Sequence, residues 1–537
     1  MARSIPDLLR ERVRATPDRE ALRRRDGDAW TSMTWAEVGE EVRRRALGFR
    51  QLGVRDEARV AIMAGTSVDW VLTDLAVLAA GGVTTTIYPS STREVVAHIV
   101  RDSGSVLVVA DPGLADRVDA EVVPIDRVPD GEPGGDYDAM VDELTPERLA
   151  TLIYTSGTTG TPKGVELTHD NWLHTAEAID ELGVLGPEEL HFLWLPMSHA
   201  FGKVLQVGMI ATGTPTAVDG EVDRIAANLA ELRPTVVAAA PRIFEKIHQK
   251  VVASMREAGG VKAKLFEWAL DVAEHPSWSL RNKIADKLVF GKLRDRVGGR
   301  IKYFISGSAP LSLPVAEFFA KAGITILEGY GLTESSAASF VNRPGSNKLG
   351  TVGRPLAGTE VRIAEDGEVL IGGRGIMRGY HNLPEETAEA LDGGWLRTGD
   401  VGELDGEGRL RLTDRKKELI KTSGGKYVAP QAVEGLIKSH SPYIGNVLVH
   451  GDQRNYCVAL VTIDPETAPA DLDADAEVGR AVEAANAGLA RHETIKRFAV
   501  LPEDFSVEDG TLTASLKMRR KEIENRYRDV LDGLYPG

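Results

Sequence analysis

Short apolar runs alternate with helical segments along roughly the first 350 residues, and this alternation strongly constrains the fold. Six of the runs are predicted to be buried strands: 58–63, 106–110, 152–155, 236–240, 303–306 and 324–327. Segments between them, such as 68–80 and 224–232, have the composition and periodicity of helices. Strands that alternate with helices in this way predict parallel, doubly wound α/β sheets.

The pattern changes near residue 350. From 350 to 412 the chain has short alternating strands with turns at Asp366-Gly367 and Asp405-Gly406, which predicts a small β-barrel-like subdomain. A charged run, 414–418, separates this region from a final stretch that mixes helix and strand on a smaller scale. At 537 residues the chain is too long for one core. We therefore predict a large N-terminal α/β domain of residues 1–414, which includes the subdomain, and a small mobile C-terminal α+β domain of residues 415–537.

Composition narrows the class of protein. The net charge of −16 argues against a nucleic-acid binder. Cys457 is the single cysteine, so no disulfide within the chain can form, which suits a reducing, cytoplasmic compartment. The sequence contains no run of about 18 apolar residues, which is the length that would predict a membrane-spanning helix.

The first residues do not have the long apolar core of a secretory signal. Ile5, Leu8, Leu9 and Val13 fit one face of a helix, with arginines on the other face. A helix packed on the core is the favoured interpretation. A helix at a membrane surface is the alternative, so a peripheral membrane contact stays open.

The segment 151–169 joins a β-forming run to a loop of small and hydroxylated residues. The loop comprises Thr155, Ser156, Gly157, Thr158, Thr159 and Gly160, and Lys163 follows it. Glycines allow close approach of the backbone to a ligand, and the hydroxyls, N–H groups and lysine suit phosphate oxygens. The loop is not a Walker A motif, because Pro162 stands where the second glycine belongs and Gly164 follows the lysine. A surface loop without a ligand is the alternative.

Two later segments have residues suited to a nucleotide. In Glu328–Glu334 a tyrosine face can pack on a purine, and a carboxylate close to phosphates can hold Mg²⁺. Residues 306–310 form a tight turn of small residues that can leave a slot for a flat base. A purely structural junction is the alternative in both places.

Three features of the C-terminal half each have a structural and a functional interpretation, and a fourth permits close approach to a ligand. Asp400 after Gly399 is either a turn residue or a ribose-binding carboxylate. The run 414–418 is either a solvated surface or a hinge, and the glycines at 424 and 425 permit close approach to a ligand. The basic cluster at 517–521 is either a helix start or a catalytic site. Neither a zinc-site spacing nor a GxSxG nucleophile motif occurs in the sequence.

These segments, in this order, resemble the signature motifs of the adenylate-forming (AMP-binding) superfamily over nearly the whole chain. KTSGGKYVAP (421–430), ISGSAPL (305–311) and IYPSS (87–91) resemble the long-chain fatty acyl-CoA synthetases more than the acetyl- or aryl-CoA branches. The resemblance implies ATP-dependent activation of a medium-to-long-chain fatty acid to acyl-AMP, then transfer to coenzyme A with release of AMP. ATP, Mg²⁺ and coenzyme A are the cofactor and co-substrates that it implies.

The resemblance also implies residue roles. It assigns phosphate binding to residues 155–160 and Lys163, with a contact from Thr333 to the α-phosphate. It places Gly307, Ser308, Ala309, Tyr330 and Gly331 around the base, Asp400 on the ribose, and Arg415 on the ribose and phosphate. Glu334 and Thr155 would hold Mg²⁺, and His199 would line the acyl carboxylate site. Lys417 would be the hinge, and Ser423, Gly424, Gly425 and Lys426 would bind coenzyme A. Lys517 would be the catalytic lysine, with Lys521 and the neighbouring arginines as the alternatives.

Two departures and two alternative functions accompany this resemblance. Leu516 stands where many members have glycine, and Phe201-Gly202-Lys203 does not contain the tryptophan that gates the acyl tunnel in some long-chain members. One alternative function is a ligase that transfers acyl-AMP to a carrier-protein pantetheine. The other is a non-catalytic protein that binds acyl nucleotides. The sequence leaves the acyl chain length and the oligomeric state open, with a homodimer among the candidates.

Overall fold

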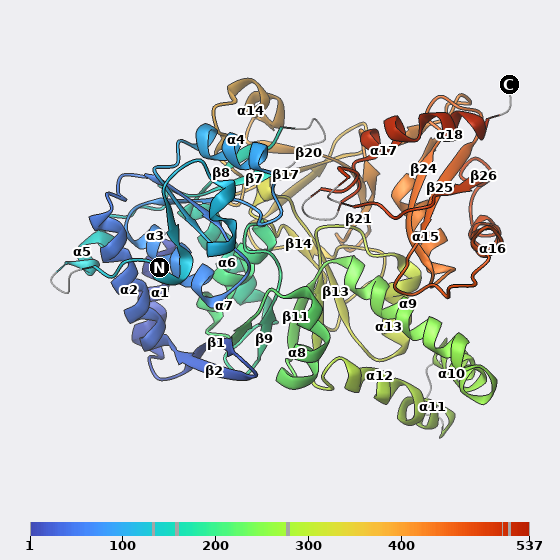
Figure 1. Ribbon diagram of the computed structural model, residues 1–537, viewed down its shortest axis with the longest axis horizontal. Helices are drawn as coiled ribbons and strands as arrows, with labels where there is room; N and C mark the ends of the chain where they lie inside the picture. Colours follow the sequence, from blue (N-terminus) through green and yellow to red (C-terminus); the bar gives the residue numbers. More distant parts are fainter. Residues whose placement is uncertain are drawn as a thin grey trace.

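A computed structural model describes residues 2–131, 135–155, 161–274, 280–506, 509–513 and 517–535 (Figure 1). Two large sheets and their helices form the N-terminal part, and a smaller part made from the last hundred or so residues lies at one end (Figure 1). No helix among these described residues is long and apolar enough to cross a membrane.

The first sheet has seven strands in the order β18-β8-β7-β4-β3-β5-β6. They are β3 (Arg59–Met63), β4 (Val83–Thr86), β5 (Leu107–Ala110), β6 (Val122–Pro124), β7 (Leu149–Thr155), β8 (Lys163–Thr168) and β18 (Gly379–Tyr380). The five strands from β6 to β7 are parallel, whereas β8 and β18 run antiparallel to their neighbours. The predicted phosphate loop therefore joins the last parallel strand to an antiparallel one.

The second sheet has nine strands in the order β15-β14-β13-β12-β11-β9-β10-β1-β2. They are β1 (Glu20–Asp26), β2 (Ala29–Thr34), β9 (His191–Leu193), β10 (Thr216–Val218), β11 (Val236–Ala239), β12 (Tyr303–Ser306), β13 (Ile326–Tyr330), β14 (Phe340–Val341) and β15 (Arg354–Pro355). Its six central strands are parallel, so the predicted doubly wound α/β architecture is confirmed. The strand predicted at 324–327 begins later, at Ile326, because the Ile324 N–H donates a hydrogen bond of 2.9 Å to the Phe319 carbonyl at the end of the preceding helix.

Helices connect the strands and cover the sheets. They are α1 (Ile5–Ala15), α2 (Trp35–Gln51), α3 (Val68–Ala79), α4 (Arg93–Ser103), α5 (Tyr137–Asp142), α6 (His169–Leu182), α7 (Ala200–Thr212), α8 (Ile225–Leu232), α9 (Pro241–Ala258), α10 (Gly260–Glu274), α11 (Leu280–Ala285), α12 (Gly291–Arg296), α13 (Leu313–Lys321) and α14 (Pro384–Ala390). Short helical turns are η1 (Pro112–Arg117), η2 (Ile125–Arg127), η3 (Val222–Arg224), η4 (Asp286–Phe290) and η5 (Thr333–Ser335). The helix predicted at the N-terminus is α1, and it packs on the core through the buried side chains of Ile5 and Leu9.

A small antiparallel sheet follows, as the alternating pattern predicted. Its strands are β16 (Glu360–Ile363), β17 (Glu368–Gly372), β19 (Leu391–Asp392), β20 (Trp395–Leu404) and β21 (Leu410–Arg415). Gly367 has a φ of 84° in the first predicted turn. In the second turn the left-handed residue is Gly408, with a φ of 75°, because the loop closes later, through Asp405 N and Arg409 O.

The C-terminal part has its own hydrophobic core, which confirms the predicted α+β unit. It contains β22 (Ile420–Lys421), β23 (Tyr427–Val428), α15 (Pro430–Ser439), β24 (Ile444–His450), β25 (Cys457–Ile463), α16 (Ala474–Asn486), β26 (Ile495–Val500), α17 (Arg520–Arg526) and α18 (Arg528–Gly533). Cys457 is buried within it. Because β21 extends to Arg415 and pairs with β20, residue 415 still belongs to the small sheet.

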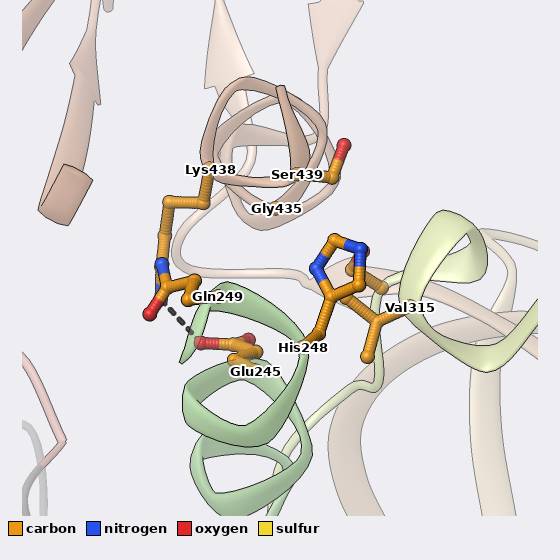
Figure 2. Close-up of a pocket in the computed structure, with 8 residues that line it drawn as sticks. Glu245, His248, Gln249, Val315, Gly435, Lys438 and Ser439 are labelled. Carbon is orange, nitrogen blue, oxygen red and sulfur yellow. Dashed lines mark hydrogen bonds and ion pairs between the residues drawn. The ribbon is translucent and has the colours of Figure 1, made fainter. Parts of the chain in front are cut away.

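Polar contacts dock α15 and β24 of the C-terminal part against α9. Lys438 Nζ lies 2.5 Å from the Glu245 carboxylate, and both side chains are about 85% buried, as their exposures of 15% and 14% indicate (Figure 2). Nearby, Arg242 Nη1 donates to the Gly445 carbonyl at 2.9 Å and Gln249 Nε2 donates to the Ile444 carbonyl at 3.0 Å. A rigid-body movement of the C-terminal part has to break this group of contacts.

An ion pair is buried inside the N-terminal part, between α3 and α7. Lys203 Nζ lies 2.5 Å from Asp74 Oδ2, and the two side chains are 2% and 0% exposed. Gln206 Nε2 also donates to Asp74 Oδ2, at 2.8 Å. Burial lowers the pKa of Lys203, while the neighbouring Asp74 carboxylate opposes this shift.

Removing only the lysine should leave the Asp74 charge buried without its partner. We expect Lys203→Met to lower the free energy of unfolding by about 3–5 kcal/mol. The double variant Lys203→Met/Asp74→Asn should recover most of this loss, because the amide that replaces the carboxylate keeps an acceptor for Gln206 without the charge. Urea unfolding followed by circular dichroism measures both variants, and equal destabilisation of the two would contradict the explanation.

Candidate active site

Three side chains meet where β13 faces the small sheet. The Tyr330 hydroxyl donates to Asp400 Oδ2 at 2.6 Å, and Arg415 Nε lies 3.2 Å from Asp400 Oδ1. Asp400 and Arg415 lie opposite each other because β20 and β21 pair in that register. Burial raises the pKa of Asp400, and Arg415 acts against this shift. Burial, together with Asp400, also raises the pKa of Tyr330, so its phenol remains a hydrogen-bond donor.

The segment predicted to line the base follows the end of β12. A Cβ added at Gly307 would lie 3.3 Å from the Phe201 ring, so this residue packs closely against the start of α7. Ser308 has a φ of 72°, an uncommon conformation for a residue with a side chain. At the end of β13, a Cβ at Gly331 would lie 2.3 Å from the Ala337 carbonyl oxygen, so only glycine fits. Ala309 completes the turn after β12.

His199 lies at the N-terminus of α7. Its Nδ1 accepts a hydrogen bond from Phe201 N at 3.0 Å. Burial, with a contribution from Lys517, lowers the pKa of His199 to about 3, so the ring is neutral at physiological pH. A neutral ring that accepts at Nδ1 carries its proton on Nε2, which makes Nε2–H a donor for a ligand.

Lys517 is brought to this group from the C-terminal part. Hydrogen bonds between residues 511–513 and 517–519 hold its backbone, including Thr513 N to the Lys517 carbonyl at 2.8 Å. Solvent still reaches the side chain, although atoms crowd it closely enough that burial lowers the pKa of Lys517. Arg415 adds to this shift, whereas carboxylates oppose it. These carboxylates are Asp400, Glu334 and Glu418.

The phosphate side of the site is only partly described. Ser156, Gly157, Thr158, Thr159 and Gly160 lie outside the described residues. Thr155 and Lys163 lie opposite each other at the ends of β7 and β8 and so frame the loop. Thr333 and Glu334 are in η5, with Thr333 buried and Glu334 half-buried.

Sequence reasoning missed Tyr380. Its hydroxyl donates to Glu334 Oε1 at 2.8 Å, and its ring lies 5.3 Å from Lys163 Nζ. The segment before Tyr380 contains glycines at 372, 373, 375 and 379, but it lies in the region predicted as short strands and turns, where glycines are expected. An aromatic residue directly after Gly379 in a predicted β region was the one available signal.

The residues predicted to bind coenzyme A are not part of this group. Ser423, Gly424, Gly425 and Lys426 are exposed between β22 and β23. The hydrogen bonds of Ser423 go to Arg454 and Asn455, which also belong to the C-terminal part. Lys417 lies in a turn that is closed by a hydrogen bond of 2.9 Å from the Glu418 N–H to the Arg415 carbonyl.

The arrangement fits a magnesium ion that is held mostly by its nucleotide. Within the described ranges, no group of three or more histidine, cysteine, aspartate or glutamate side chains is arranged to hold a metal ion. Mg²⁺ is commonly bound by one or two protein oxygens together with substrate phosphates, and it keeps several waters. Tyr380 donates to one oxygen of Glu334, no bond from a described residue to the other oxygen is seen, and Thr155 has a hydroxyl at the end of β7.

Comparisons with known proteins agree with this geometry. The model of a family described as AMP-binding enzyme matches residues 9–381, and the model described as AMP-binding enzyme C-terminal domain matches residues 417–537. Long-chain-fatty-acid–CoA ligase FadD15 of Mycobacterium bovis is 34% identical, covering 99% of this chain and 97% of its own. Long-chain-fatty-acid–CoA ligase ACSBG1 of Mus musculus is 30% identical, covering 95% of this chain and 82% of its own.

Solved structures show the same fold. The adenylation domain of the carboxylate reductase of Mycobacterium chelonae has a TM-score of 0.78 and 23% identity, covering 99% of this chain and 91% of its own. O-succinylbenzoate coenzyme A synthetase of Bacillus subtilis in complex with ATP and magnesium has a TM-score of 0.70 and 22% identity, covering 96% of this chain and 99% of its own. Since the family model spans most of the chain and full-length relatives exceed 30% identity, this protein belongs to the AMP-binding enzyme family.

Proposed function

We propose that this protein activates long-chain fatty acids with ATP and transfers the acyl group to coenzyme A. The position of Lys517 carries the proposal: a lysine of the C-terminal part lies within electrostatic range of Asp400, Arg415 and Glu334. A fatty acid and ATP are both anions, so their reaction needs positive charge where the two meet. The names of the full-length relatives supply the substrate class.

In the first step a carboxylate oxygen of the fatty acid bonds to the α-phosphorus of ATP. The bond from that phosphorus to the bridging oxygen breaks, and pyrophosphate leaves with the electron pair. The Lys517 ammonium and the Arg415 guanidinium are placed to stabilise negative charge that builds up on the α-phosphate. The Nε2–H of His199 is suited to hold the carboxylate. Asp400, already paired with Arg415, is suited to the ribose hydroxyls.

Magnesium fits the phosphate side of this site. Glu334 and Thr155 would hold it together with the phosphates, as the donor set described above supports. When bound, it neutralises phosphate charge. Lys163, at the start of β8, is suited to the same phosphates.

In the second step the coenzyme A sulfur bonds to the acyl carbon, the bond from that carbon to the phosphate oxygen breaks, AMP leaves with the electron pair, and the thiol proton is released to solvent. The glycine-containing loop of residues 423–426 is the proposed coenzyme A site, and its residues are exposed in this arrangement. We therefore propose that the C-terminal part rotates about Lys417 between the two steps. Its separate core supports movement as a unit, and the Lys438–Glu245 pair is one contact that the rotation must break (Figure 2).

Location and assembly remain predictions. A peripheral membrane contact has some support on η4 and the neighbouring helix α11. Ile284 and Leu288 are 41% and 43% exposed there, and Arg281, Lys283 and Lys287 are exposed around them. Apolar side chains surrounded by basic residues suit an anionic membrane surface. A cytoplasmic location and a homodimer are likewise expectations of the sequence.

Lys517→Ala should impair acyl-AMP formation while leaving ATP binding nearly unchanged. Loss of one preorganised charge donor typically costs roughly 10²–10³ in rate. ATP–pyrophosphate exchange measures this step, and thioester formation from synthetic acyl-AMP should be affected much less. Lys521→Ala is the matched control, since Lys521 is an exposed lysine nearby. If both half-reactions of Lys517→Ala fall equally, or if Lys521→Ala has the larger effect, the assignment is wrong.

Lys417→Pro should produce the opposite pattern. Proline fixes φ and so should hinder the rotation, leaving adenylation active while acyl-AMP accumulates and thioester formation slows. Lys417→Ala is the control, because it shortens the side chain but leaves φ free. Rapid-quench assays of both half-reactions test the pair. Normal overall turnover of the proline variant would place the hinge elsewhere.

The substrate preference should favour medium-to-long fatty acids over acetate and benzoate. Each buried methylene contributes about 0.8 kcal/mol, and this gain should appear mainly in KM, because the tail lies far from the reacting carboxylate. Measuring kcat/KM for acetate, benzoate, octanoate, laurate and palmitate, with free coenzyme A and with a phosphopantetheinylated carrier protein, tests both substrate class and acceptor. A maximum at acetate or benzoate would reject the long-chain assignment, and transfer only to the carrier protein would reject coenzyme A as the acceptor.

A further inference from the structure

Tyr380 contacts both sides of the proposed phosphate and magnesium site. Its hydroxyl donates to Glu334 Oε1 at 2.8 Å, and its ring face lies 5.3 Å from Lys163 Nζ. Glu334 belongs to η5, after the second large sheet, whereas Lys163 begins β8 of the first sheet. One side chain therefore links a carboxylate and an ammonium that come from different sheets.

The backbone around Tyr380 is fastened to the same two elements. Tyr380 pairs with Val165 in the β8–β18 ladder, and His381 N donates to the Gly164 carbonyl at 2.8 Å. Toward the other side, Met377 N donates to the Glu334 carbonyl, also at 2.8 Å. The segment 377–381 thus fixes its tyrosine relative to both the strand that leaves the phosphate loop and the turn that carries Glu334.

A third attachment restrains Tyr380 from α14. The Tyr380 N–H donates to Thr387 Oγ1 at 2.9 Å. A Cβ at Gly379 would lie 2.8 Å from Thr387 Cγ2, so the backbone approaches this helix closely. These contacts leave Tyr380 little freedom to move away from Glu334.

The phenol is suited to orient a carboxylate without neutralising it. A phenol is a hydrogen-bond donor at physiological pH, and the Tyr380 hydroxyl donates to Glu334 Oε1 at 2.8 Å. A neutral donor on one carboxylate oxygen restricts rotation of the group and leaves the charge and the second oxygen for a cation. Hydrogen bonds of this kind to metal-binding carboxylates commonly tune metal affinity.

We propose that Tyr380 is a positioning residue: it orients Glu334 for the magnesium ion of bound ATP through its hydroxyl and holds Lys163 at the phosphates through its ring. The inference rests on the proposed function, since it requires a magnesium–nucleotide complex at this site. The hydroxyl and the ring have separable tasks, so two substitutions distinguish them.

Calorimetric titration with a non-hydrolysable ATP analogue, at a series of Mg²⁺ concentrations, tests the proposal without turnover. Tyr380→Phe should raise the Mg²⁺ concentration that gives half-maximal enhancement of analogue binding by roughly tenfold or more. It should leave binding without Mg²⁺ unchanged, because the ring over Lys163 remains. Tyr380→Leu should also weaken binding without Mg²⁺, by a few-fold, because the cation–π contact is lost.

Tyr154→Phe is the matched control. The Tyr154 hydroxyl also donates to a carboxylate, Asp102 Oδ2 at 2.6 Å, and Tyr154 lies on the strand that leads into the phosphate loop. It should not change the Mg²⁺ dependence. A second check combines Tyr380→Phe with Glu334→Gln, where the tyrosine substitution should add little because its effect acts through Glu334.

Each outcome decides the proposal. An unchanged Mg²⁺ dependence in Tyr380→Phe overturns it, as does an equal shift in Tyr154→Phe or full additivity with Glu334→Gln. Melting temperatures without nucleotide show whether each variant is folded. Failure of the proposed function is distinguishable, because the wild-type protein itself would then show no ATP–pyrophosphate exchange and no Mg²⁺-dependent binding of the analogue.

Discussion

Two cations, Lys517 and Arg415, approach each other where the C-terminal part meets the small sheet, and the site depends on the carboxylates that make this arrangement tolerable. Like charges lower the pKa of a lysine, and Arg415 acts on Lys517 in this way. Asp400 pairs directly with Arg415, while Glu334 and Glu418 also act in favour of the charged lysine. The two cations are therefore compensated by three nearby carboxylates.

This charge arrangement exists only while the two parts of the chain are docked. The contacts described between α9 and the C-terminal part are ion pairs and hydrogen bonds to carbonyl groups, and each part has a separate apolar core. Polar interfaces between units with their own cores are those in which relative movement is expected. Lys517 and the loop at 423–426 belong to the same unit, so one movement would exchange one for the other.

The proposed phosphate side of the site is built from groups that belong to the two large sheets or to the turns between their strands. Lys163 and Glu334 lie far apart in sequence, and β18 connects them through a two-residue strand. A hydrogen bond from a hydroxyl to one carboxylate oxygen orients the carboxylate and leaves its charge intact. Asp400 has a similar arrangement, because Tyr330 donates a hydrogen bond to one of its oxygens and Arg415 pairs with the other.

The sequence by itself determined the class of fold, because hydrophobic periodicity is a local property that reports strand or helix directly. It also determined which side chains are candidates, since the motif order places Asp400, Arg415 and Tyr330 near a nucleotide by resemblance. Only the tertiary structure decided which of them touch: Tyr330 and Asp400 are 70 residues apart, and Tyr380 and Glu334 are 46 apart. Such contacts depend on strand register and on how the sheets pack, and no local pattern in the chain encodes either, which is why the contacts of Tyr380 could not be predicted from its place after Gly379.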